Sequence, residues 1–417
     1  MRASGFHKFQ DTIKPGKDGC NLLAVFIEQV GLRIINFFTF AIVARCTDLF
    51  EMGTLGLAWT VLYFIEALAS GGFNDTYVQH KRSDDITKST FFWICVTSGT
   101  CGFTLMIFAG MFGDLLIKDS DFQQIASFLG AIFLLKKLGG AHQTVLVRAQ
   151  AHGALAIRTL VASSISAFLG VYFALEGFGI WAILWRNALE AFLRSVFCLF
   201  YSFWRPLWCF DIQFAREIVI PALPIVGSSV AKLAIGSTQQ IAVSSILGLN
   251  VLGGIEVAKR LPVIFQQSSG AVISRFMKPF LSERVRKNLD NAQIILCSIK
   301  VGVAVAVIAL TAVFFLKESL LGWIFGEQWV TFSDLFFILM VWTTSSIFIS
   351  FFGSVLTAYG SFKASTVDFV YKLCSFPLFV SLLFYSVNLS YATICAFQAV
   401  CAIHMFHLVR KKIRPIK

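Results

Sequence analysis

The sequence is poor in charged residues. Asp, Glu, Lys and Arg together make up 14% of the 417 positions, whereas hydrophobic residues make up 57%. That balance leaves too little polar surface to cover a water-soluble globule of this length. The low charge excludes an ordinary soluble protein and predicts a chain whose solvent is the bilayer.

Motifs of common catalytic and cofactor sites are also missing. The sequence has no G-x-x-x-x-G-K-[ST], no H-E-x-x-H and no G-x-S-x-G, and its ten cysteines show no C-x-x-C spacing. We therefore expect no ATP-driven pump, no hydrolase, no metal and no cofactor. Asp48 and Glu51, in the first outward turn, are the carboxylates that an outer catalytic site would use, but two solvated turn residues explain them more simply.

Long apolar runs are abundant. A spanning helix needs about 20 apolar residues, and runs of this kind, rich in the 45 phenylalanines, are apolar on all sides. They predict an all-α integral membrane protein with about twelve spans. The predicted spans are 22–43, 53–72, 90–113, 122–147, 154–175, 179–202, 218–243, 250–274, 292–316, 332–358, 365–386 and 388–408.

The basic residues orient these spans. Of the 35 Lys and Arg residues, 22 fall in the N-terminal segment, in alternate connections or in the C-terminal tail. The outward connections hold only three, Arg45, Lys118 and Lys317. By the positive-inside rule both termini are cytoplasmic. The first twenty residues lack a signal-peptide pattern. The net charge of +12 is explained by the basic residues on the cytoplasmic side, so no nucleic-acid partner is expected.

The chain has the pattern of two similar halves. Residues 49–55 (LFEMGTL) match residues 249–255 (LNVLGGI) at an offset of 200, and the same offset aligns Ala58 with Ala258. Each stretch joins the first and second helix of a six-helix half, as a parallel repeat requires. We expect an N-terminal lobe over 1–203, an interfacial linker over 204–217 and a C-terminal lobe over 218–417, around a central cavity.

Charged residues inside the spans are the most informative. Besides Arg158, which lies near the cytoplasmic end of its span and is counted with the connections, ten are basic: Arg33, Lys136, Lys137, Arg186, Arg194, Lys232, Lys259, Arg260, Lys300 and Lys372. Besides Asp334, at the start of its span, five are acidic: Glu28, Glu66, Glu190, Glu256 and Asp368. Each basic residue costs about 2.5 to 3.5 kcal/mol at a helix centre, so the set predicts a hydrated or anion-occupied cavity. The positive excess favours an anionic substrate.

The spacing of these charged residues along their helices indicates which of them form ion pairs. Arg186, Glu190 and Arg194 step by four residues along one face, as do Glu256 with Arg260 and Asp368 with Lys372, so ion pairs are expected. Glu28 and Glu66 lack a basic residue one turn away on their own helices, which makes them candidates for proton or sodium coupling; a packing role fits them equally well. The candidate substrate-binding residues are Arg33, Lys136, Lys137, Arg186, Lys232, Lys259 and Arg260.

Six stretches carry a resemblance to a known family. They are AIVARCTDLFEMGTLGLAW from Ala41, GGFNDTYVQHKRSDDITKSTFFW from Gly71, GFGIWAILWRNALEAFLRSVFCLFYSFWRP from Gly177, VAKRLPVIFQQSSGAVISRFMKPFLS from Val257, FGEQW from Phe325 and LTAYGSFK from Leu356. In order and spacing they resemble the polysaccharide-exporting flippases of the multidrug/oligosaccharidyl-lipid/polysaccharide (MOP) superfamily. The resemblance implies two six-helix lobes around a cavity that opens alternately to either side.

The resemblance also bears on the substrate. Related lipid II flippases carry a cavity arginine in a stretch similar to VAKRL, which implies that role for Arg260. Their other arginines fall on Thr39, Ile65 and Glu66 here, which counts against lipid II as substrate. Arg33, about two turns before Thr39, either supplies the missing charge or is unrelated.

The implied function is transport rather than catalysis. A polyprenyl-pyrophosphate-linked oligosaccharide would cross the bacterial cytoplasmic membrane for O-antigen, capsule or exopolysaccharide synthesis. Membrane lipids and a polysaccharide polymerase or export protein would be its partners. The alternatives are a drug or metabolite antiporter of the same fold and a membrane-embedded glycosyltransferase or polymerase.

Reporter fusions after Lys118 and after Lys287 test the topology. Because Lys287 ends a basic segment and Lys118 lies in a connection poor in basic residues, the two reporters are expected on opposite sides of the membrane. A fusion at the C-terminus should agree with the one after Lys287. Readings on the same side for the first two would contradict the twelve-span arrangement.

Overall fold

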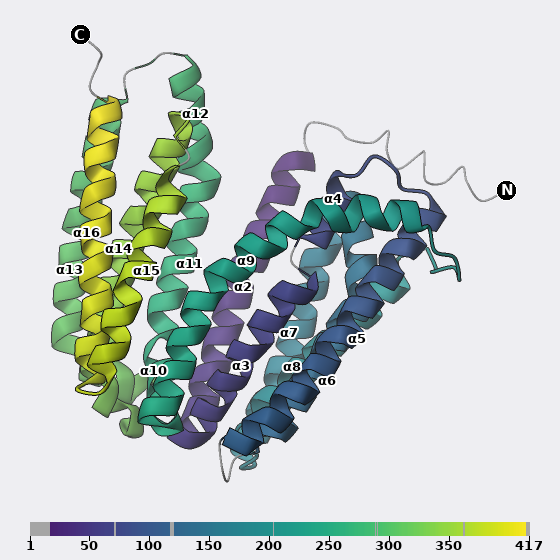
Figure 1. The fold of residues 1–417 in the computed structure, drawn as a ribbon, viewed down its shortest axis with the longest axis horizontal. Helices are drawn as coiled ribbons and strands as arrows, with labels where there is room; N and C mark the ends of the chain where they lie inside the picture. Colours follow the sequence, from purple (N-terminus) through teal and green to yellow (C-terminus); the bar gives the residue numbers. More distant parts are fainter. Residues whose placement is uncertain are drawn as a thin grey trace. The chain divides into compact units, whose positions relative to one another are not determined.

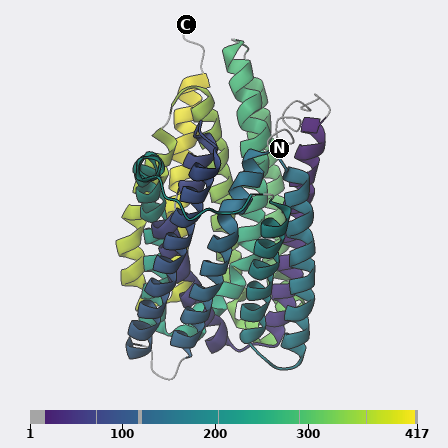
Figure 2. The same ribbon diagram turned by 90° about the vertical axis from the view of Figure 1, so that its right-hand side faces the viewer.

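The fold is helical throughout the part of the chain that the structure describes. This computed structural model describes residues 17–70, 72–116, 121–202, 204–287, 289, 291–361 and 363–413. Every regular element within them is a helix, and Figures 1 and 2 show long helices with short connections. The expected all-α membrane fold is confirmed.

The helices follow the predicted spans closely. They are α2 (Lys17–Arg45), α3 (Leu49–Ser70), α4 (Phe73–Gln79), α5 (Asp85–Leu116), α6 (Phe122–Arg148), α7 (His152–Leu175), α8 (Trp181–Tyr201), α9 (Ile212–Leu247), α10 (Leu249–Ala258), α11 (Arg260–Val272), the π-helical turn η1 (Ile273–Met277), α12 (Lys278–Arg286), α13 (Ala292–Phe325), the 3₁₀ helix η2 (Glu327–Phe332), α14 (Ser333–Ala358), α15 (Lys363–Leu383) and α16 (Val387–Ile413).

Ten stretches of helix among the described residues are long and apolar enough to cross a membrane. The two predicted spans outside this count have identifiable differences. Helix α8 carries three charged residues, at 186, 190 and 194. The span predicted over 250–274 is divided at Lys259 into α10 and α11, and α10 has only ten residues.

The chain forms two compact units. The first contains residues 1–46 and 61–230, and the second contains residues 47–60 and 231–417. In the first unit α5 packs on α6, α2 packs on α7, and α8 packs on both α6 and α7. In the second unit α14 packs on α16 and α13, and α15 packs on α16 (Figure 1). Each unit therefore has its own helical core.

The linker predicted over 204–217 is held against the first unit. Leu207 and Asp211 donate their backbone N–H groups to the hydroxyls of Ser89 and Thr90, both at 3.0 Å. The Trp93 indole N–H donates to the Leu207 carbonyl at 3.0 Å. These bonds satisfy backbone groups of a non-helical segment with side chains from the start of α5.

Asp211 begins α9 by capping it. Its carboxylate accepts the backbone N–H groups of Phe214 and Gln213 at 3.1 and 3.0 Å, as an N-cap does. Arg82 lies 3.4 Å away. The hydrogen bond from Phe214 is the largest cause that holds the pKa of Asp211 below its usual range.

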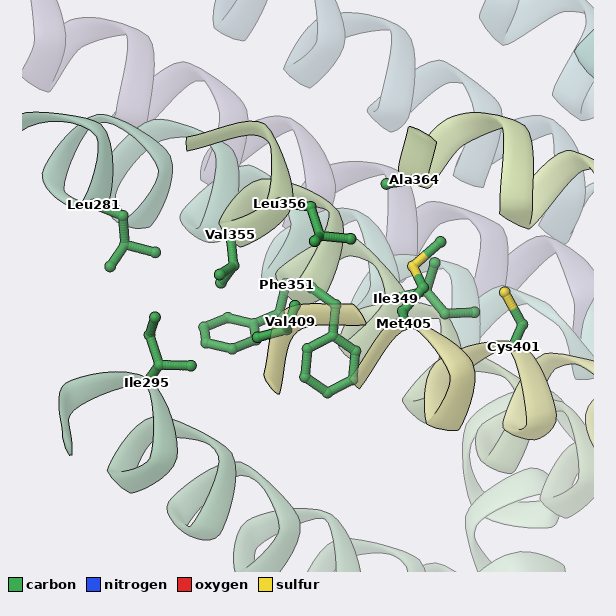
Figure 3. Close-up of a cluster of buried hydrophobic side chains, with 11 residues drawn as sticks. Leu281, Ile295, Ile349, Phe351, Val355, Leu356, Ala364, Cys401, Met405 and Val409 are labelled. Atoms are coloured by element: carbon green, nitrogen blue, oxygen red, sulfur yellow. The ribbon is translucent and has the colours of Figure 1, made fainter. Parts of the chain in front are cut away.

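An apolar cluster anchors one end of the second unit. Leu281 from α12 and Ile295 from α13 point toward one another, and Val355 from α14 lies beside them (Figure 3). Farther along, Cys401 and Met405 of α16 complete the cluster, and all five side chains are buried. This packing joins the short α12 to the long helices.

Two glycines at the predicted repeat pack reciprocally in the second unit. A Cβ on Gly53 would overlap the Leu249 carbonyl, and a Cβ on Gly253 would overlap the Leu49 carbonyl. Helices α3 and α10 begin at Leu49 and Leu249, so the 200-residue offset also relates the two partners. The contact has local two-fold character, and only glycine leaves room for it.

Replacement of either glycine tests this contact. Gly53→Ala is expected to lower the free energy of unfolding by about 1 to 3 kcal/mol, because the methyl group must displace a backbone carbonyl. Gly236→Ala on α9 is the control, since a Cβ there meets nothing within 4 Å. Its effect should be neutral or stabilising by up to about 1 kcal/mol. Equal melting temperatures for the two purified variants would contradict the assigned contact.

Candidate functional site

A cavity of about 320 Å³ lies inside the first unit. Helices α3 to α8 contribute its walls, and its polar surface is dominated by charge. The charged lining residues are Glu66, Lys136, Lys137, Arg158, Glu190 and Arg194. Three amides, Asn74, Gln143 and Asn187, line it as well. Four cations against two carboxylates make the lining positive.

Arg158 is the most unusual of these residues. It lies on α7, is 5% exposed, and has no described carboxylate within ion-pair distance. Its guanidinium donates to the Cys198 Sγ at 2.8 Å and lies 3.4 Å from Gln143 Oε1 and Thr159 Oγ1. Its Nε has no hydrogen-bond partner among the described residues. A buried cation with weak, neutral acceptors favours an anion beside it.

The predicted ladder on α8 is confirmed. Glu190 pairs with Arg194, and its other carboxylate oxygen lies 3.8 Å from Arg186. Ser163 of α7 donates to Glu190 Oε1 at 2.8 Å and accepts from Arg194 at 3.0 Å. Arg186 also donates to Asn36 of α2 and is 6% exposed. Arg194 and Glu190 line the cavity, whereas Arg186 is not among the lining residues.

Two predicted substrate residues and one coupling candidate meet at this cavity. Lys136 and Lys137 come from α6, and Glu66 comes from α3. Lys137 lies 5.1 Å from the centre of the Phe133 ring and interacts electrostatically with Glu66. The other coupling candidate, Glu28 on α2, interacts electrostatically with Arg194. Both carboxylates thus have basic neighbours on other helices.

The remaining predicted residues lie elsewhere in the chain. Arg33 is half-buried on α2 of the first unit and does not line this cavity. Arg260 is half-buried at the start of α11 in the second unit. The side chain of Lys232 lies outside the described residues. Their participation in one substrate cavity stays a prediction.

Lys259 takes part in a polar cluster of the second unit. It forms an ion pair with Glu256, which was expected to pair with Arg260. Gln240 donates to the same Glu256 oxygen at 3.1 Å, and Thr60 donates to Gln240. Elsewhere in this unit the predicted pair of Asp368 and Lys372 is confirmed, at 2.7 Å.

Sequence reasoning missed Arg158 as a site residue. It was counted among the basic residues of the cytoplasmic connections, because it lies near the end of its predicted span. Its position on α7 faces Cys198 of α8 and Gln143 of α6. A usable signal was present in the sequence, since Arg158 falls inside the span predicted over 154–175, where a buried basic residue is costly.

Two solved structures, a transporter and a lipid flippase, have a similar fold. A multidrug resistance MATE family transporter of the MOP superfamily, in an inward-facing conformation, matches with a TM-score of 0.66 at 16% identity, covering 94% of this chain and 98% of the other. The lipid II flippase MurJ also matches at 0.66, with 12% identity and coverage of 94% and 89%. At this identity the likeness shows the fold alone.

Sequence comparison gives the family. A profile described as polysaccharide biosynthesis protein matches residues 42–334, more than half of the chain. The succinoglycan biosynthesis transport protein ExoT of Rhizobium meliloti (strain 1021) is 23% identical over 308 residues, which span 73% of this chain and 61% of ExoT. The chain belongs to the polysaccharide biosynthesis protein family, which confirms the predicted relationship to proteins of polysaccharide biosynthesis.

Gly140 allows the cavity to be blocked without a change of charge. It lines the cavity on α6, and a Cβ there would meet nothing within 4 Å. Gly140→Leu is therefore expected to fold normally but to fill part of the space and reduce transport at least tenfold. Gly153→Leu is the control, because Gly153 also has open space around its Cβ but is not a lining residue. Wild-type transport by Gly140→Leu would show that the substrate does not need this cavity.

Proposed function

We propose that the protein moves a polyprenyl-diphosphate-linked oligosaccharide across the bacterial cytoplasmic membrane and that the cavity of the first unit binds the diphosphate. The observation that carries the proposal is the cluster of Lys136, Lys137, Arg158 and Arg194 at one cavity within a bilayer-spanning unit. Membership of a polysaccharide biosynthesis family supports the choice of a sugar-bearing anion.

The chemistry of the lining suits this ligand. A diphosphate supplies the negative charge that Arg158 lacks, and a guanidinium can hold two phosphate oxygens at once. Asn74, Gln143 and Asn187 offer both donors and acceptors to sugar hydroxyls. At about 320 Å³ the cavity is at the small end of ligand pockets. It would hold the diphosphate and the adjoining sugar, while the lipid remains in the bilayer.

A second group of cations belongs to the same proposal. Arg33, Lys232, Lys259 and Arg260 would contact the substrate at another stage of its passage, and Arg260 is the foremost of them because of the resemblance of its VAKRL stretch. Glu28 and Glu66 would link transport to a proton or sodium ion. Both termini would lie in the cytoplasm, and a polysaccharide polymerase or export protein would receive the product.

Reconstituted protein tests the proposal. Vesicles carrying a lipid-diphosphate oligosaccharide on one leaflet should expose the glycan to an added lectin on the other side, and Arg158→Gln should slow this at least tenfold, because it removes the buried positive charge. Lys300→Gln is the matched control, since Lys300 is an exposed residue of α13 that does not line the cavity.

Each alternative function has its own outcome in this assay. Movement of cationic drugs, with no movement of the lipid-linked glycan, would identify an antiporter. New glycosidic bonds formed by the purified protein in detergent would identify an enzyme. Normal glycan exposure with Arg158→Gln would remove the cavity from the mechanism.

A further inference from the structure

Glu190 is the carboxylate that pairs with Arg194 at the wall of the cavity. Its Oε1 contacts Arg194, and Ser163 holds that oxygen in place with a hydrogen bond of 2.8 Å. Ser163 is fully buried and accepts a hydrogen bond from Arg194 at 3.0 Å. The three groups form a closed ring at the cavity wall. In this arrangement a carboxylate of the protein satisfies the cation that faces the cavity.

A second arginine stands on the other side of the same carboxylate. Arg186 lies one turn before Glu190, and Arg194 lies one turn after it. The Oε2 atom is already 3.8 Å from Arg186 Nη2, just beyond hydrogen-bond length. Arg186 is anchored by Asn36 and packs against Gly170, where an added Cβ would lie 3.0 Å from its own Cβ. It is thus a fixed cation outside the cavity.

We propose that Glu190 is a counter-ion switch: the substrate diphosphate displaces it from Arg194, and the carboxylate turns to Arg186. This inference rests on the proposed function and adds how the same cavity binds and releases its ligand. Before binding, Glu190 neutralises Arg194. After binding, the diphosphate takes Arg194 together with Arg158, and Arg186 neutralises Glu190.

The switch solves an energetic problem of this site. A carboxylate left without a partner inside the protein is strongly unfavourable, and one left beside a diphosphate is repelled by it. A small turn of one side chain toward Arg186 avoids both costs. The return of Glu190 to Arg194 then competes with the bound anion, so the ligand is held but can leave, as transport requires.

Binding of inorganic pyrophosphate tests the switch. Calorimetry would use the purified full chain in nanodiscs of zwitterionic lipid, where no anionic headgroup competes. Glu190→Gln, which keeps the shape but loses the charge, is expected to lower the Kd about tenfold, about 1.4 kcal/mol. The same variant should move lipid-linked glycan more slowly with a lower KM, since release loses its competitor.

A double-mutant cycle separates the switch from simple electrostatics. Arg186→Gln should raise the Kd about tenfold in the wild-type background, because Glu190 then has nowhere to turn. In the Glu190→Gln background the same change should have no effect, whereas two independent charge effects would add. Arg186→Lys keeps the charge, so its Kd for pyrophosphate should lie within about threefold of the wild-type value. This variant also keeps the test available if Arg186→Gln does not fold. Glu176→Gln, at an exposed turn, is the neutral control.

The outcomes distinguish this inference from the proposed function. If wild type binds pyrophosphate and Glu190→Gln binds no better, or if the cycle is additive, the switch is wrong and the proposed function stands. If neither wild type nor Glu190→Gln binds it, both are wrong. Repetition in phosphatidylglycerol nanodiscs should leave the Kd unchanged; a marked rise would assign the cavity to lipid headgroups and overturn the switch as a substrate device.

Discussion

The cost of placing charge inside a bilayer governs the first unit. A basic side chain at the centre of a spanning helix costs about 2.5 to 3.5 kcal/mol, and α8 alone carries two arginines and a glutamate. Their spacing of four residues lets the carboxylate of Glu190 serve both arginines. Ser163 of α7 and Asn36 of α2 supply further hydrogen bonds. The charged helix is therefore tolerated because its neighbours present matching polar groups.

Small residues make these arrangements possible. Gly170 on α7 lets the stem of Arg186 approach the helix backbone, which brings α7 and α8 close together. Gly56 on α3 does the same for Glu256 in the second unit. A glycine opposite a long charged side chain gives it room along the helix surface while its end reaches a partner. The same glycines thus allow close helix packing and the burial of a charged side chain.

What the sequence could predict depended on how local the interaction was. The Arg186, Glu190, Arg194 ladder and the Asp368 pair follow from spacing along a single helix, and both are confirmed. The burial of Arg158 was missed because it depends on α6 and α8, which only the fold brings together.

Pairs near a helix break were less predictable. Glu256 was expected to pair with Arg260 one turn ahead, but α10 ends at Ala258 and Lys259 takes the contact instead. An uninterrupted helix would place residues i and i+4 on one face. The positions of the long apolar spans, by contrast, could be predicted from the sequence to within several residues of the observed helices. Their composition alone requires a bilayer-spanning helix.

The two halves share a backbone plan but differ in chemistry. The reciprocal contact of Gly53 and Gly253 preserves the repeat where backbone meets backbone. Three residues later the same offset pairs Gly56 with Glu256, so only one copy carries a charge. At the same offset Lys136 and Lys137 of α6, which line the cavity, fall on Phe336 and Phe337 of α14, a helix whose one charged residue is Asp334. A repeat can thus maintain the fold through a few close backbone contacts while one copy acquires the buried charges, since those charges need partners only within their own unit.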